Sequence, residues 1–137
     1  MWWTYALLSA FFAALTAIFA KVGIKGVDTD LATAIRTVVI LVIAWAIAFI
    51  RGGASTILLL TKQNILFLCL SGVATGLSWI FYFKALQLGK VSQVAPVDKM
   101  SVAIAIVLSA IFLGEVLDVK TIIGALLIII GTLVLIF

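Results

Sequence analysis

The stretch VSQVAPVDKM, residues 91–100, places two charges inside a segment that otherwise has the composition of a membrane span. Asp98 and Lys99 are adjacent, and the residues from Ser101 to Leu113 that follow them are almost all apolar. An ionisable side chain within a bilayer costs roughly 2.5–3.5 kcal/mol on insertion scales, so such residues commonly mark ion or substrate pathways. Pro96 lacks a backbone N–H and should loosen the helix beside the charges. Residues 91–100 are therefore a candidate pathway segment.

The composition of the whole chain requires a lipid environment. Of its 137 residues, 66% are hydrophobic and only 10% are charged, whereas a soluble domain is nearer one quarter charged. The net charge is +4, but the basic residues are scattered along apolar segments and form no patch, which argues against a nucleic-acid partner. The chain has no histidine and one cysteine, Cys69, which we expect to be a small packing residue. We therefore predict no metal site and no cofactor.

Five apolar runs are long enough to cross a hydrocarbon core, which needs about twenty residues per helix. They lie at about 2–22, 31–50, 64–86, 92–113 and 119–137. Residues 54–63 are too short to cross and should lie at the membrane interface. Thr29 or Asp30 is expected to cap the second span and Asp118 the fifth. We predict an all-α integral membrane protein with one domain, residues 1–137, since the short alternating segments of a barrel are absent.

An odd number of spans puts the two termini on opposite sides of the membrane. Such a unit is one half of an inverted-repeat transporter, in which the second half faces the other way. The loop charges bear on orientation, because Lys and Arg favour the cytoplasmic side. Arg51, Lys62 and Lys120 lie on one side, against Lys25 and Lys90 on the other, with Lys21 and Lys84 at span edges. This near balance permits dual topology, and a single fixed orientation also remains open.

Small residues should mark helix contacts, because lipid-exposed helices gain no hydrophobic effect from associating. The third span contains a G-x-x-x-G motif, Gly72 to Gly76, and the fifth contains Gly124 and Gly131 two turns apart. We expect these glycines to pack helices within one subunit. The fifth span is also our candidate for a dimer contact.

Alternation of the spans places several charges on one side of the membrane. They are Lys21, Arg36, Lys84, Asp98 and Lys99. Arg36 and Asp98 lie roughly 8–9 Å inside their spans at 1.5 Å per residue. The bland interpretation is an ion pair from Asp98 to Arg36, Lys84 or Lys99, with the long cationic chains snorkelling to the surface. The functional one is a carboxylate that binds a cation, exchanges a proton or holds a cationic gate, whereas a mainly cationic layer favours an anionic substrate.

The third span carries aromatic residues shortly before Lys84, among them Trp79, Tyr82 and Phe83. Trp79 and Phe83 share a helix face, as do Ser78 and Tyr82. An aromatic belt facing the headgroups is the simpler interpretation. The alternative is a wall that stacks on flat or cationic substrates.

The chain resembles a known family over essentially its whole length. The residues that show the resemblance are Ser71 to Trp79, Tyr82 to Leu86, Gly89 to Ser92, Val94 to Ser101, Leu113 to Glu115 and Ile123 to Gly131. They resemble the EamA branch of the drug/metabolite transporter superfamily, in its single-unit, five-helix form. The resemblance implies secondary transport of small metabolites or drugs, and puts Pro96, Asp98 and Lys99 at a motif position. It also implies a homodimer, since one unit is too small to enclose a pathway, and antiparallel pairing would imitate the fused ten-helix members.

The leading hypothesis is thus a homodimeric secondary-active transporter, an exporter, in the inner or plasma membrane of a bacterium or archaeon. The alternative is a non-transporting membrane subunit or assembly factor whose charges form structural ion pairs. An enzyme is not expected, because no nucleophile–base arrangement or phosphate-cradling loop is visible. Glu115, at a turn near Lys120, is most simply a solvated residue. Substrate, direction, coupling ion and the parallel or antiparallel sense of the dimer are left open by the sequence.

Overall fold

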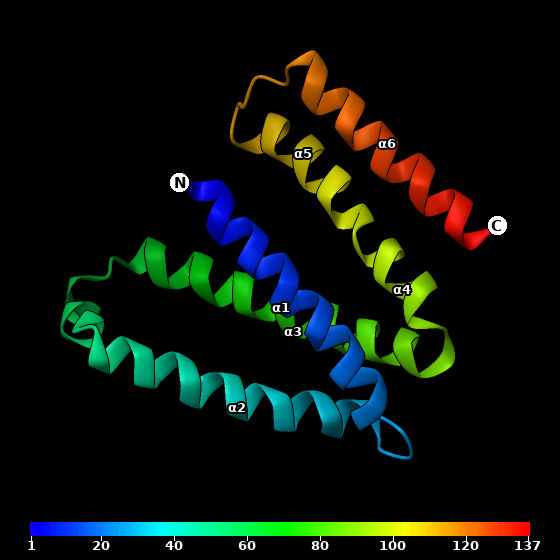
Figure 1. The fold of residues 1–137 in the computed structure, drawn as a ribbon. Helices are drawn as coiled ribbons and strands as arrows, with labels where there is room; N and C mark the ends of the chain where they lie inside the picture. Colours follow the sequence, from blue (N-terminus) through cyan, green and yellow to red (C-terminus); the bar gives the residue numbers. More distant parts are fainter. The chain divides into compact units, whose positions relative to one another are not determined.

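The computed structural model describes all of residues 1–137 and contains only helices (Figure 1). In chain order these are α1 (Trp2–Gly23), α2 (Thr29–Ile50), the 3-10 helix η1 (Gly53–Leu59), α3 (Lys62–Leu88), α4 (Val91–Asp98), α5 (Met100–Phe112) and α6 (Val119–Ile136). Five segments are long and apolar enough to span a membrane, with α4 and α5 forming one of them, Val91–Phe112. The predicted all-α membrane fold and its five spans are confirmed, with ends that differ from the predicted ones by at most two residues.

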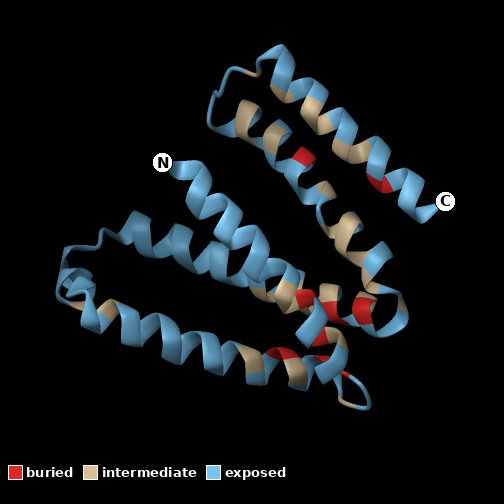
Figure 2. Cartoon of the chain, in the orientation of Figure 1, coloured by how far each residue is buried: buried red, intermediate tan, exposed pale blue.

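Most of the helical surface is exposed, including large apolar side chains along every span (Figure 2). In water, exposure of so much apolar surface would destabilise the fold. In lipid this exposure carries no free-energy penalty, because hydrocarbon tails are as apolar as the side chains. Cys69 is exposed on α3, so the prediction that it is a small packing residue was wrong.

The cap of α2 differs from both predicted residues. Asp28 is the N-cap, with extended backbone angles, and its Oδ1 accepts hydrogen bonds from the N–H groups of Asp30 and Leu31 at 3.0 Å each. Thr29 and Asp30 already lie inside the helix. A carboxylate at the N-cap can reach two otherwise unpaired N–H groups. A carboxylate inside the first turn reaches them less well.

Asp118 caps α6, as predicted. Its Oδ1 accepts a hydrogen bond from the Thr121 N–H at 2.9 Å and another from the Thr121 hydroxyl. Both bonds favour the charged form and so hold the pKa of the Asp118 carboxyl below its ordinary value. The bond from the Thr121 hydroxyl has the larger effect, and the bond from the Thr121 N–H the next largest.

The Asp118 cap gives a pH dependence of stability whose sign is fixed. Because the folded-state pKa is depressed, the cap contributes fully above the ordinary aspartate pKa, and its contribution disappears as the pH falls through the lower folded-state value. Asp118→Ala should therefore be less stable than the wild type at neutral pH, and the difference should shrink as the pH falls below the ordinary aspartate pKa. Thermal unfolding in detergent, followed by circular dichroism across this range, measures the difference. A pH-independent gap between the two proteins would contradict this account.

By its contacts the chain divides into two compact units. Unit 1 comprises Met1–Ile18 with Leu88–Phe137, and unit 2 comprises Phe19–Gln87.

In unit 1 the span that contains Pro96 is broken into two helices, where the sequence predicts a loosened one. Helix α4 ends at Asp98, Lys99 lies in a turn, and α5 starts at Met100. Proline cannot donate the i→i−4 hydrogen bond, and its ring crowds the carbonyl of the preceding turn, so Pro96 weakens α4 on its N-terminal side, and the helix is interrupted three residues later, at Lys99. Helix α6 contacts both α4 and α5, running back alongside them (Figure 1). We refer to α4 and α5 together as the broken span.

Thr132 ties α6 to the broken span. Its side chain is almost fully buried, and its Oγ1 lies 2.8 Å from the Ile128 carbonyl in its own helix and 3.3 Å from the Pro96 carbonyl in α4. A hydroxyl has one hydrogen, so the two acceptors share it. The sequence analysis did not single out Thr132, although a polar residue in an otherwise apolar span is a usable signal.

We expect Thr132→Val, which keeps the shape and removes the hydroxyl, to lower the free energy of unfolding by about 0.6 kcal/mol, the average for side-chain hydrogen bonds between membrane helices. Thr37→Val is the matched control, because the Thr37 hydroxyl bonds only to the Thr33 carbonyl of its own helix, at 2.8 Å. Equal losses for the two variants, measured by denaturant unfolding in detergent, would show that the contact to Pro96 adds nothing.

In unit 2 the C-terminal end of α3 is fastened by hydrogen bonds from other segments. The Lys21 ammonium donates to the Leu86 carbonyl, and the Gln87 amide donates to the Val27 carbonyl at 3.2 Å. Phe83 and Leu86 are fully buried here. A lysine beside the last carbonyls of a helix satisfies an otherwise unpaired acceptor and complements the helix dipole.

The α2–α3 connection contains the short helix η1, which fits the predicted interfacial segment. Gly52 precedes it with a φ of 73°, a left-handed conformation that glycine adopts without strain. The chain then presents Ile57, Leu58 and Leu59 at its surface, with Leu58 90% exposed. A short apolar helix between two spans is suited to lie among the headgroups.

Candidate functional site

Arg36 forms the centre of a cluster in unit 2. It lies two turns into α2, about 10 Å from the helix start at 1.5 Å per residue. Its guanidinium carbon is 4.2 Å from the centroid of the Trp79 ring and 4.5 Å from that of Phe83, both on α3. The two rings follow each other at i, i+4 on one helix face, as predicted, so one cation reaches both. We call Arg36, Trp79 and Phe83 the arginine–aromatic cluster.

The rings offset only part of the cost of placing Arg36 at this depth. A guanidinium within the hydrocarbon costs roughly 2.5–3.5 kcal/mol on insertion scales, and cation–π contacts return about 0.5–2 kcal/mol. Arg36 has no carboxylate partner. The ion pair in the structure joins Lys99 to Asp98 and does not involve Arg36. The cluster therefore holds a positive charge that no anion of the chain neutralises.

Asp98 and Lys99 pair with each other at the break in unit 1. The Lys99 ammonium is 3.1 Å from an Asp98 carboxylate oxygen, with side chains 58% and 33% exposed respectively. Neighbours in a continuous helix point about 100° apart. The interrupted helix and the long lysine side chain bring them together instead. Of the three cations considered for Asp98, Lys99 is the one it contacts.

The other predicted pathway residues take part less directly. Pro96 lies in α4 and accepts hydrogen bonds through its carbonyl from the Lys99 N–H and from Thr132. The Tyr82 ring lies 6.1 Å from the Phe83 ring, at the edge of the arginine–aromatic cluster. Lys84 is exposed on α3. Sequence reasoning placed Phe83 beside Trp79 but did not identify it as a partner of Arg36.

The glycines predicted to pack helices have open space around them. A Cβ atom built at Gly72, Gly76, Gly124 or Gly131 would meet no atom of another residue within 4 Å. Within their own units these positions are not closely packed, and helix packing through them stays a prediction. A contact of the α6 glycines with a second copy stays a prediction.

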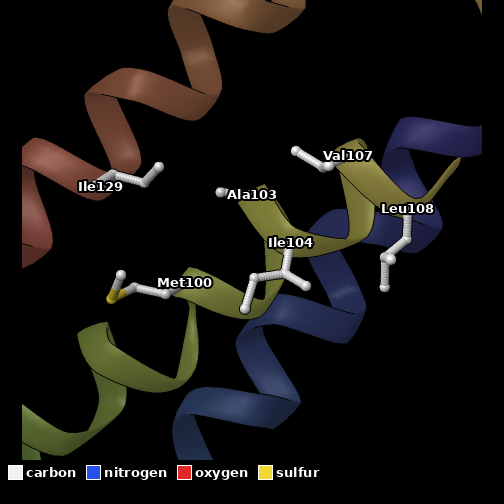
Figure 3. Close-up of a pocket in the computed structure, with 6 residues that line it drawn as sticks. All are labelled: Met100, Ala103, Ile104, Val107, Leu108 and Ile129. Atoms are coloured by element: carbon white, nitrogen blue, oxygen red, sulfur yellow. The ribbon is translucent and has the colours of Figure 1, made fainter. Parts of the chain in front are cut away.

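An apolar cleft lies along the broken span in unit 1 (Figure 3). Its volume is about 240 Å³, and it is lined by Met100, Ala103, Ile104, Val107, Leu108 and Ile129. Five of these side chains come from α5 and one from α6. Because no charged group lines it, the cleft cannot orient a charged substrate by itself.

No three His, Cys, Asp or Glu side chains gather in a way that could hold a metal ion. The chemistry available at the two charged sites is thus electrostatic: an exposed ion pair at a helix break and an unneutralised cation against aromatic rings. Such groups bind and release charged ligands.

The comparisons with known proteins agree with this membrane architecture. Residues 1–137 match the EamA-like transporter family. The chain is 47% identical over 134 residues to an uncharacterized transporter encoded in the cobO 3' region of Sinorhizobium, covering 98% of this chain and 95% of the relative. It is 37% identical over 79 residues to an uncharacterized protein of Methanocaldococcus jannaschii, covering 57% and 58%. No solved structure matches it with significance. With five spans and a family match from its first residue to its last, the chain belongs to the EamA-like transporter family.

Proposed function

We propose that this protein is a secondary-active exporter of small metabolites or drugs that works as a homodimer in a bacterial or archaeal inner membrane. The observation that carries the proposal is the broken span, where an ion pair is held at membrane depth in a chain of a transporter family. Non-helical backbone at that depth is tolerated where it lines a cavity or is buried in protein. Charges there are typical of coupling-ion or substrate sites.

The topology of the chain supports a homodimer. Five spans orient the termini oppositely, so two copies inserted in opposite directions reproduce the arrangement of an inverted repeat. The pathway would then lie between the copies.

A structural subunit is the second candidate, and the Asp98–Lys99 contact favours it. A paired carboxylate and ammonium can stabilise a membrane protein without any role in flux. In that case, alteration of Asp98 should change stability alone.

Transport by the purified protein decides between the two. Reconstituted liposomes carrying an imposed pH or sodium gradient are offered a panel of labelled amino acids, organic anions and cationic dyes. A transporter gives gradient-dependent flux of at least one class above that of protein-free liposomes. Absence of flux across the panel, with the protein shown to be folded and inserted, supports the structural subunit.

A further inference from the structure

The arginine–aromatic cluster has the features of a binding site for an anion. Phe83 is fully buried and fixes one side of the cluster, while Trp79 and Arg36 are half-buried. The guanidinium is thus held against rigid rings, yet part of it remains open to a ligand. A pre-positioned guanidinium loses little freedom when it binds.

The hydrogen-bonding capacity of Arg36 is not used by the chain. Aromatic rings interact with the π-face of a guanidinium, whereas its five N–H groups point outward in the plane of the group. Arg36 makes no hydrogen bond to a side chain or carbonyl and has no ion pair. The nearest hydroxyls on α2 donate within their own helix, Thr33 to the Thr29 carbonyl and Thr37 to the Thr33 carbonyl, each at 2.8 Å, and neither accepts a hydrogen bond from Arg36.

The balance of charge in the spans points to the same sign of ligand. Asp98 is the one carboxylate placed well inside a span, and Lys99 already neutralises it. The other acidic residues, Asp28, Asp30, Glu115 and Asp118, lie in connections or in the first turn of a helix. The charge available to a ligand in the membrane-spanning part of unit 2 is therefore positive.

We infer that the arginine–aromatic cluster binds the oxyanion of a small organic molecule, a carboxylate or a phosphate, through the N–H groups of Arg36, with the apolar part of the ligand beside Trp79. Arginine matches two oxygens of such a group in a bidentate contact. This inference rests on the proposed transport function for its physiological meaning, but it concerns binding, which can be measured without flux.

The experiment is a titration of the full-length protein in detergent by calorimetry. The probes are benzoate, phenyl phosphate, benzylammonium and benzyl alcohol, which share a ring and differ in the group attached to it. We expect saturable binding of benzoate or phenyl phosphate and none of the cation or the neutral alcohol. The stronger of the two anions identifies carboxylate or phosphate as the preferred group.

Variants assign the binding to Arg36. Arg36→Gln should weaken anion binding by roughly tenfold or more, and Arg36→Lys, which keeps the charge and loses the planar fork, should weaken it by less. Arg51→Gln is the matched control, since Arg51 lies at the C-cap of α2, outside the cluster. Helicity and gel-filtration profile verify folding, and Arg36→Lys keeps the test informative if the neutral variant does not fold.

Two results overturn the inference: anion binding unchanged in Arg36→Gln, or benzylammonium binding as tightly as benzoate. Its failure is distinct from failure of the transport proposal. Gradient-driven flux of cationic dyes with no anion binding overturns the inference alone, whereas Arg36-dependent anion binding without flux of any class overturns the transport proposal alone.

Discussion

Asp98→Asn should reduce gradient-driven flux in liposomes by on the order of tenfold or more, while the protein remains folded. Asparagine keeps the size of the side chain and removes its charge. The carboxylate can then no longer exchange a proton or hold a cation, and Lys99 loses the partner that lies 3.1 Å away. Initial rates of uptake or efflux, normalised to the amount of inserted protein, measure the effect.

Asp30→Asn is the control for this prediction, because Asp30 lies in the first turn of α2 and forms no ion pair. Its flux should equal that of the wild type. Flux in Asp98→Asn that is undiminished and still depends on the ion gradient would remove Asp98 from coupling. Parallel losses of flux and of folded protein would assign Asp98 the structural role of the second candidate function.

Reporters fused to the C-terminus should be active on both sides of the membrane, and loop charges should control the ratio. The α2–α3 connection carries Arg51, with Lys62 at the start of α3, and both lie on the side opposite the C-terminus. Replacing both with alanine leaves more cations on the C-terminal side. That side then becomes cytoplasmic, since Lys and Arg are retained there.

The measurement uses alkaline phosphatase, active outside the cytoplasm, and a fluorescent protein, active inside. We expect the ratio of fluorescence to phosphatase activity to rise roughly tenfold in the Arg51→Ala, Lys62→Ala variant. Lys25→Ala with Lys90→Ala is the mirror-image control and should lower the ratio. Phosphatase activity that stays at background in all three proteins would exclude dual insertion and, with it, the antiparallel dimer.

The spans were predictable because each is a continuous apolar run, and bilayer thickness fixes the length of such a run. Loosening of the helix near Pro96 was predictable for a local reason, the missing N–H, but the exact place of the break, at Lys99, was not. The cap of α2 was not, because Asp28, Thr29 and Asp30 are all suitable residues and only backbone geometry distinguishes them.

The composition of the candidate site was partly predictable, and its contacts were not. Arg36 and Trp79 were both singled out, one for its charge and the other for its ring, but spacing along the chain cannot show that α2 brings the cation to that ring. Thr132 was missed, because a single hydroxyl contributes little to a hydropathy pattern. Contacts between helices depend on how the helices are rotated and shifted, and an evenly apolar span specifies neither.

The helix η1 has a consequence for the shape of the bilayer. Its exposed leucines would insert among the lipids of one leaflet and expand that leaflet relative to the other. Two copies facing the same way would place both wedges in one leaflet and favour a curved membrane. Two copies facing opposite ways would place one η1 helix in each leaflet, so that the two expansions cancel and the pair favours a flat bilayer.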